Sequence, residues 1–244
     1  MIQGITLGIQ GMTPLIQRQD QIANNLANIN TTGYKQSGLF IGTFQKYFTN
    51  DEHEPFTNRE IGPEAVYIDY SEGPMKKTGN NLDVLIKGSG FFTVMTQNGV
   101  RYTRNGNFSI NSDGLLITND GSKVLGKNGF IRLNSQGNVK INSTGEILQG
   151  NESKGSLRIT DFKKPYKLLR DGTSYFRPQL PDNPVIPSTG FYIKQGFLEG
   201  SNVSPIKNMV EMIRAVRNFE ADQRALQAHD QTLDKAVNSV GRIG

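Results

Sequence analysis

A glycine-rich segment is the closest approach of this sequence to a nucleotide site. Residues 121–128 nearly match the phosphate-binding loop, which requires Ser or Thr where Asn128 stands, because that hydroxyl binds Mg²⁺. The loop must also open a helix whose N-terminus faces the phosphate. Here Gly129 and another strand-like run follow. We therefore predict a hairpin turn at this position.

Acidic residues and histidines offer the other candidates for catalysis. Paired carboxylates could support glycoside hydrolysis, but Asp113 and Asp120 each precede a glycine, where Asp accepts backbone hydrogen bonds in a turn. The chain has two histidines, His53 and His229, and no cysteine. Thiolate metal sites are therefore excluded, and a Ser-His-Asp relay has little to draw on. We predict no catalytic, cofactor-binding or metal-binding residue.

An asparagine-rich segment, residues 24–28, is harder to explain by an ordinary structural role alone. Asn is a poor helix former, because its amide competes for backbone hydrogen bonds. One interpretation is a helix C-terminus, from which the chain leaves through Gly33 in the left-handed conformation. The other is that Asn24, Asn25 and Asn28 hydrogen-bond to neighbouring subunits. Both stay open, and these four residues are counted as candidate interface residues.

Composition limits the class of protein further. Of the 244 residues, 35% are hydrophobic and 20% are charged, and no run approaches the roughly 20 apolar residues of a membrane-spanning helix. The net charge of +5 is not clustered as a nucleic-acid groove requires. Glycine and glutamine interrupt the first residues, so we expect no cleaved secretory signal.

The N-terminal end repeats apolar residues at alternating steps of three and four, the seam of a coiled coil. Pro14 falls within this pattern. Because proline removes a backbone hydrogen bond, a kink or a fresh helix start is expected there. The seam residues that we predict to form an interface are Ile5, Ile9, Met12, Ile16 and Leu26.

The C-terminal end carries a similar seam. Ser204 and Pro205 provide an N-cap and a first-turn proline, and Gly241 marks the end. A helix with so narrow an apolar face must find a partner to offset its ordering entropy. We expect that partner to be the other terminal helix and further copies of the chain. The predicted interface residues are Met209, Met212, Val216, Phe219, Leu226, Leu233 and Val237.

Glycine-containing turn dipeptides recur in the middle of the chain at steps of seven or eight residues, as in Asn98-Gly99 and Asp113-Gly114. Such dipeptides favour hairpins, because type I′ turns need positive φ at both central residues. Strand-like runs lie between them, including Phe91–Thr96 and Val100–Arg104. A β-solenoid would require a tighter internal repeat. We predict a domain of short, mostly antiparallel strands.

The predicted fold is therefore α+β. Residues 1–33 and 204–244 are expected to form a terminal coiled-coil domain, residues 34–65 an extended linker, and residues 66–203 a β-rich domain. This organisation suits a subunit that polymerises through its ends. It suits an enzyme less well, because an enzyme needs a pocket on a rigid central scaffold.

Several motifs are similar to those of the flagellar axial proteins, the bacterial rod and hook family. They occur in the family's order from the first helix to the last, so the resemblance covers essentially the whole chain. The matching segments are Ala23–Lys35, Thr78–Val84, Ile86–Phe92, Tyr102–Gly106 and Gly196–Val203.

The resemblance implies a structural subunit with no catalytic residue. Such a subunit is exported by the flagellar type III apparatus without a cleaved signal. It assembles with copies of itself and other rod proteins into a helical tube that transmits torque across the periplasm from motor to hook. The terminal helices would form the inner domain, the β domain would face outward, and the segment near 31–65 would link neighbours. No nucleic acid, small-molecule substrate or membrane span is implied.

Within that family the resemblance favours the proximal-rod type over the distal-rod or hook type. Residues 69–75 and 217–220 lean toward the proximal type, whereas residues 86–92 look equally like the distal one. The long inserted domains of a hook protein are missing. From other classes, the rival hypotheses are a peptidoglycan hydrolase, a nucleotide-binding protein and a surface adhesin with a trimeric coiled coil.

Overall fold

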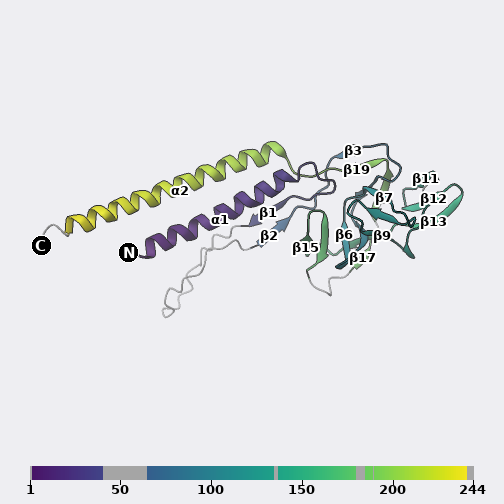
Figure 1. The fold of residues 1–244 in the computed structure, drawn as a ribbon, viewed down its shortest axis with the longest axis horizontal. Coiled ribbons are helices and arrows are strands. Elements are labelled where there is room, and N and C mark those ends of the chain that lie inside the picture. Colours follow the sequence, from purple (N-terminus) through teal and green to yellow (C-terminus); the bar gives the residue numbers. More distant parts are fainter. Residues whose placement is uncertain (1, 41–64, 135–136, 180–184, 189, 241–244) are drawn as a thin grey trace. The chain divides into compact units, whose positions relative to one another are not determined.

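The fold has a helix at each end of the chain and strands between them (Figure 1). The helices are α1 (Ile2–Ala27) and α2 (Pro205–Val240). The chain divides into two compact units: a helical unit of residues 1–27, 37–69 and 204–244, and a β unit of residues 28–36 and 70–203. The structure, a computed structural model, describes residues 2–40, 65–134, 137–179, 185–188 and 190–240.

In the helical unit, α1 and α2 lie side by side and run in opposite directions (Figure 1). α2 begins at Pro205, as the Ser204-Pro205 signal predicts. α1 runs through Pro14 as one helix, so no fresh start occurs there. Strands β1 (Ser37–Phe40) and β2 (Ala65–Ile68) pair antiparallel in the same unit. Residues 41–64, most of the predicted linker, lie outside the described residues.

The prediction that the terminal helices form a coiled-coil domain is wrong. The seam predicted for α2 consists of two rows of side chains, and only one of them is partly covered. In that row Met212, Phe219 and Leu226 are half-buried. On the other row, Met209 is 51% exposed and Val216 is 39% exposed. A coiled coil requires both rows to insert into the partner helix, so the two helices pack without a continuous seam.

The physical reason is that the apolar residues of α2 spread over more of the helix circumference than its covered face. With 3.6 residues per turn, Met209 and Val216 share a face with Ile213, which is 54% exposed. The buried face instead carries Asn208, which is 1% exposed, and Ala215, which is 3% exposed. A three-and-four spacing in the sequence does not distinguish a single seam from two faces.

The seam predicted for α1 is misplaced in the same way. Ile16, one of its members, is 45% exposed, whereas Ile22 is 4% exposed and Asn25 is 2% exposed. Met12 and Leu26 are half-buried. The face of α1 that is covered therefore includes a buried amide, which does not fit an apolar coiled-coil seam.

The strands of the β unit pair antiparallel wherever the structure describes them, which confirms the antiparallel prediction and excludes a solenoid. Phe91–Thr96, predicted as a strand, is β5. The strands are β3 (Met75–Lys77), β4 (Val84–Gly88), β5 (Phe91–Thr96), β6 (Gly99–Thr103), β7 (Phe108–Ile110), β8 (Leu116–Thr118), β9 (Lys123–Gly126), β10 (Gly129–Phe130), β11 (Val139–Ile141), β12 (Glu146–Gln149), β13 (Glu152–Ser156), β14 (Ile159–Phe162), β15 (Leu168–Asp171), β16 (Tyr175–Pro178), β17 (Val185–Pro187), β18 (Phe191–Gln195) and β19 (Phe197–Glu199).

These strands form one large sheet and three smaller ones among the described residues. The large sheet has the order β15-β16-β6-β5-β9-β8-β7, with β10 beside β9, while β14 pairs with β5 and β17. The smaller sheets are β11-β12-β13, β18-β4 and β19-β3. Apolar side chains of the large sheet, of β11-β12-β13 and of β18-β4 meet in one core, in which Val84, Phe92 and Ile147 are fully buried.

Turn glycines set many of the strand connections, as predicted. Gly99, Gly114 and Gly121 have positive φ angles of 94°, 74° and 86°, a region that other residues enter only at a cost. Gly106 serves a different purpose, because a Cβ atom there would lie 1.7 Å from the carbonyl oxygen of Val84. That glycine permits close approach of two backbones where the sequence pattern predicted a hairpin turn.

Candidate functional site

The asparagines at the end of α1 have different surroundings. Asn25 is buried: its Nδ2 donates to the carbonyl oxygen of Ser37 at 2.7 Å, and its Oδ1 accepts from the Ser37 N–H at 3.1 Å. Asn24 is exposed and donates to the Asp20 carbonyl oxygen at 2.9 Å, and Asn28 accepts from the Thr31 hydroxyl at 3.1 Å. Asn25 thus ties α1 to β1 within the chain, while contacts to other subunits stay a prediction.

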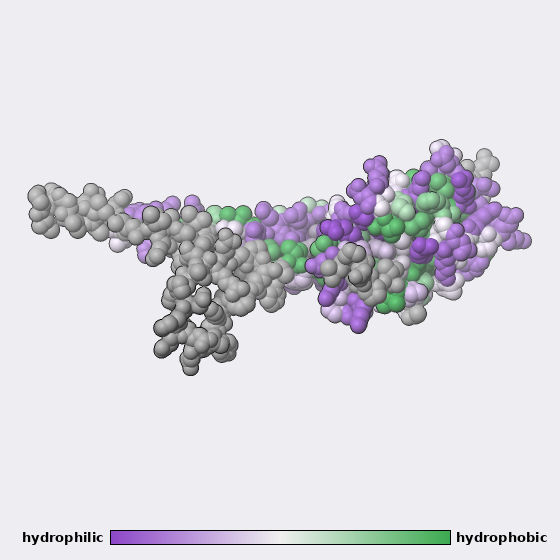
Figure 2. Space-filling view, turned by 90° about the horizontal axis from the view of Figure 1, so that it is seen from below, coloured by the Kyte–Doolittle hydropathy of each residue, from purple (hydrophilic) through white to green (hydrophobic). Residues whose placement is uncertain are grey.

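The first part of α2 carries exposed apolar residues on one face. Their exposed fractions run from 39% at Val216 to 77% at Ile206. Positions three, four and seven apart share a helix face, so these side chains form a stripe. Figure 2 shows apolar side chains at the surface of the helical unit among polar ones. We name as the outer apolar stripe Ile206, Met209, Val210, Ile213 and Val216.

Two of the predicted interface residues, Met209 and Val216, belong to this stripe. Three sequence-predicted members of α2, Met212, Phe219 and Leu226, are half-buried on the other face. The structure therefore does not bring the predicted set together on one surface. The side chains outside the described residues are those of Ile5, Ile9, Leu233 and Val237.

Gly33 has the left-handed conformation expected of it, with a φ of 69°. It does not cap α1, which ends at Ala27. It is instead seated in the β unit, where its N–H donates to the Glu199 carbonyl oxygen at 2.8 Å. A Cβ atom at this position would lie 2.5 Å from the Asn105 nitrogen. Only glycine fits this approach.

Two residues after Gly33, a charged cluster is buried in the β unit. Lys35 and Glu199 are each 1% exposed, and Lys35 Nζ lies 2.6 Å from Glu199 Oε1. The same Nζ donates to the Ser71 carbonyl oxygen at 2.6 Å, and the Gly73 N–H donates to Glu199 Oε1 at 2.9 Å. Arg104 Nη1 lies 3.5 Å from Glu199 Oε2. We call Lys35, Glu199 and Arg104 the junction cluster.

Carbonyl oxygens offset the excess positive charge of the junction cluster. Arg104 donates to the carbonyl oxygens of Ile86 at 3.2 Å and Gly88 at 2.7 Å. Buried charges are tolerated when ion pairs and hydrogen bonds satisfy them. The sequence analysis missed this cluster, although Lys35 and Glu199 both lie in the family-like motifs. The separation of the two residues along the chain gives no local signal of pairing.

Arg170 covers the neighbouring Tyr34. Its guanidinium lies 4.3 Å from the centre of the Tyr34 ring and 5.6 Å from that of Phe176. It also donates to the carbonyl oxygen of Lys35. Burial lowers the pKa of Arg170, a cost that the two rings and the carbonyl oxygen offset. This contact adds a third hold on the segment that contains Lys35.

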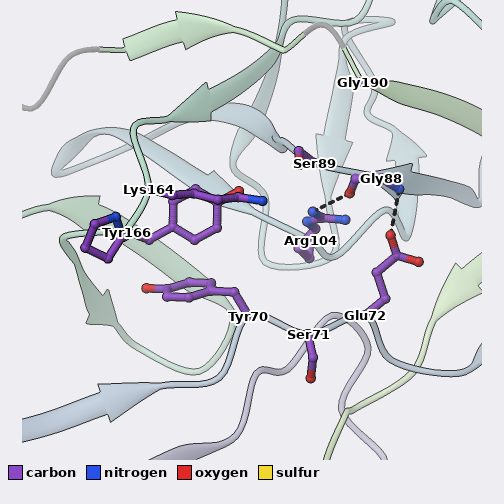
Figure 3. A pocket seen from close by; sticks show the side chains of 10 residues that line it. Tyr70, Ser71, Glu72, Gly88, Ser89, Arg104, Lys164, Tyr166 and Gly190 are labelled. Carbon is purple, nitrogen blue, oxygen red and sulfur yellow. Dashed lines mark hydrogen bonds between the residues drawn. The ribbon is translucent and has the colours of Figure 1, made fainter.

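A pocket of about 510 Å³ lies beside Arg104 (Figure 3). Glu72 accepts from the Gly88 N–H at 2.8 Å, and the Tyr70 and Tyr166 rings stand edge to face with centres 4.9 Å apart. Burial first, and its hydrogen bond to Asp161 second, raise the pKa of Tyr166 to about 12, so the phenol stays neutral. Glu72 and Arg104 are thus both bonded to the backbone of Gly88.

The motifs that suggested a nucleotide site or catalytic carboxylates form turns in the structure. Residues 121–128 belong to the β9–β10 hairpin, and no helix follows them. Asp120 accepts hydrogen bonds from the hydroxyls of Thr118 at 2.6 Å and Ser122 at 2.8 Å. Within the described ranges, no group of three His, Asp or Glu side chains could hold a metal ion. No helix there is long and apolar enough to cross a membrane.

Comparison with known protein families places these features in a class. A model of the flagellar basal body rod protein matches residues 6–35, and a model of the D1 domain of the flagellar hook protein FlgE/F/G matches residues 85–149. A model of the C-terminal region of the rod proteins FlgEFG matches residues 194–239. The chain thus has the three-part organisation of the flagellar rod and hook class.

Full-length relatives narrow the class. The flagellar basal-body rod protein FlgF of Caulobacter vibrioides is 32% identical, aligned over 100% of this chain and 99% of its own length. FlgG of Bacillus subtilis is 31% identical over 98% of this chain and 99% of its own, and FlgF of Mesorhizobium japonicum is 29% identical over 99% of each. The chain belongs to the flagellar basal-body rod protein family.

Proposed function

We propose that this chain is a structural subunit of the flagellar basal-body rod that assembles through the outer apolar stripe of α2. The observation that carries the proposal is the stripe itself, on which Ile206 is 77% exposed and Ile213 is 54% exposed. Exposed contiguous apolar surface in a water-soluble chain marks a protein–protein contact. Rod proteins of this family assemble with other rod subunits.

The size of the stripe favours polymerisation over a simple dimer. Burying five such side chains contributes at most roughly 7–15 kcal/mol, at about 1.5–3 kcal/mol each. Association of two free molecules costs about 4–15 kcal/mol in lost translational and rotational freedom. One stripe contact barely offsets that cost. Each subunit therefore needs several neighbours at once, as in a helical polymer.

The remaining parts of the proposal follow from the family. The names FlgF and FlgG of the relatives favour the proximal-rod type. We assign the helices α1 and α2 to the inner part of the tube and the β unit to its outer part. Export by the flagellar apparatus without a cleaved signal, torque transmission and the lack of enzymatic activity belong to the same proposal.

The test replaces Ile213 with Asp in a strain that lacks its own copy of this gene. Ile213→Asp should abolish swimming and leave the protein missing from purified basal bodies, because a charge cannot be buried in the stripe contact. Phe130→Asp is the matched control, since Phe130 is 49% exposed but lies in the β unit. It should swim and assemble as the wild type does. Normal assembly of Ile213→Asp would contradict the role of the stripe.

A further inference from the structure

The chain changes unit at four points, between residues 27 and 28, 36 and 37, 69 and 70, and 203 and 204. Three of these points lie beside residues that contact one another inside the β unit. Lys35 precedes the second, Ser71 follows the third, and Asn202 precedes the fourth. Three of the four ends of the β unit's two segments are therefore gathered at one place in that unit.

Side chains cross-link these ends. Asn202 Oδ1 accepts from the Gln36 N–H at 2.6 Å, and its Nδ2 donates to the Ser71 hydroxyl at 3.2 Å. The Asn202 N–H donates to the Tyr34 carbonyl oxygen at 3.3 Å. Lys35 Nζ joins the Ser71 carbonyl oxygen to the carboxylate of Glu199. Each of these three segment ends is thus bonded to the other two.

The backbones at this place are also in close contact. A Cβ atom on Gly73 would lie 2.0 Å from the Gly200 carbonyl oxygen. The Gly200 N–H donates to the Pro74 carbonyl oxygen at 2.8 Å. These contacts, with Gly33 on the third segment, leave no room for the segments to slide past one another. The arrangement resists displacement along the chain direction as well as separation.

A buried ion pair is a poor means of adding stability. Its desolvation cancels most of its attraction, and apolar residues of similar volume often do as well. Such a pair can instead supply a defined geometry, because both charges must keep their partners. The choice of Lys35 and Glu199 at this place therefore fits a need for fixed position.

We propose that Lys35, Glu199 and Asn202 form a clasp, a set of cross-links that makes the three segment ends of the β unit move as one body under mechanical load. Force that reaches the β unit through any one segment is then shared by all three. The inference rests on the proposed rod function, in which the subunit carries torque. The three residues are positioning residues in that mechanical role.

The first experiment measures coupling in the purified full chain by hydrogen–deuterium exchange. Lys35→Met keeps the aliphatic stem and removes the ammonium group. Exchange should accelerate by about tenfold or more in residues 28–36, 70–74 and 196–203 together, because one partner of a buried pair is lost. The core strand β5 should keep its rate. Acceleration confined to residues 28–36, or none, would overturn the clasp.

Matched variants keep this test decisive. Lys154→Met removes the exposed ion pair of Lys154 with Glu152 in the same unit and should change none of the three segments. If Lys35→Met also accelerates β5, the variant has unfolded the unit. Asn202→Ala then replaces it, because it leaves the Lys35–Glu199 pair intact. The same pattern of joint acceleration is required of it.

The second experiment applies load. In the gene-deletion strain, cells with the wild type should swim in media of low and high viscosity. Cells with Asn202→Ala should swim at low viscosity and lose swimming, with broken basal bodies, at high viscosity. Equal swimming of both at every viscosity would overturn the clasp. Failure of the wild type to restore any swimming would overturn the rod function instead. The coupling of the three segment ends would still be tested by the hydrogen–deuterium exchange experiment.

Discussion

At the scale of single residues, Asp120 carries a carboxylate of the kind that enzymes use in catalysis, but here that carboxylate stabilises a turn. Burial alone would raise its pKa, but hydrogen bonds from Thr118, Tyr175 and Ser122 outweigh burial and hold the pKa of Asp120 below its usual value. For Tyr175, burial first and the bond to Asp120 second raise the pKa to about 12. The carboxylate is therefore engaged as an anion that closes the turn between β8 and β9.

Asp120→Asn should lower the free energy of unfolding at neutral pH by about 0.5–1 kcal/mol, since the site is largely exposed and screened. Because the pKa of Asp120 is depressed on folding, its contribution is fully present above the ordinary value of 3.8 and is lost as pH falls through the folded value. Urea denaturation from about pH 7 to about pH 3 should show the gap to wild type closing.

Asp113→Asn is the control for this series, because Asp113 occupies an equivalent Asp-Gly turn and is exposed. Its gap to wild type should be small at every pH. A gap for Asp120→Asn that stays constant or widens in acid would contradict the role given to the carboxylate.

Gly33 provides a second residue-scale prediction, with a natural control in Gly172. Their φ angles are 69° and 70°, but a Cβ atom on Gly33 would meet backbone at 2.5 Å, whereas nothing lies within 4 Å of one on Gly172. Gly172→Ala should cost about 1–2 kcal/mol in backbone strain. Gly33→Ala should cost clearly more, measured by urea denaturation. Equal losses would mean that residues 28–36 are not seated as described.

At the scale of elements, what can be predicted depends on how local the signal is. The start of α2 at Pro205 and the strand β5 are set by neighbouring residues, so the sequence predicts them directly. The buried face of α2 is not predictable in this way, because apolar residues occupy both of its sides. The partners Lys35 and Glu199 are separated by 164 positions, and only the folded β unit brings them together.

The two faces of α2 should respond differently to a charge. Phe219 is half-buried. Phe219→Asp should therefore lower the helical content of the free chain, measured by circular dichroism, because a charged carboxylate is costly to keep in a half-buried site and weakens the packing there. Ile213 is 54% exposed, and Ile213→Asp should leave that content unchanged. If both variants lose helix equally, α2 does not have one covered and one open face.

At the scale of the whole molecule, charge and apolar surface oppose each other in assembly. Every copy carries a net charge of +5, so like copies repel, and salt relieves that repulsion through screening. The outer apolar stripe attracts, and this attraction strengthens with excluded salts such as sulfate and weakens on cooling. The two effects can be separated, because screening depends on ionic strength alone.

Sedimentation of the purified protein in chloride and in sulfate at equal ionic strength should therefore distinguish them. If the stripe drives polymerisation, sulfate should give more polymer than chloride, and cooling should dissolve it. Ile213→Asp should lose the extra response to sulfate but keep the response to ionic strength, because its repulsion is still screened. Equal polymer in both salts, or less polymer with added salt, would show that charge contacts hold the copies together, and the stripe would lose its role.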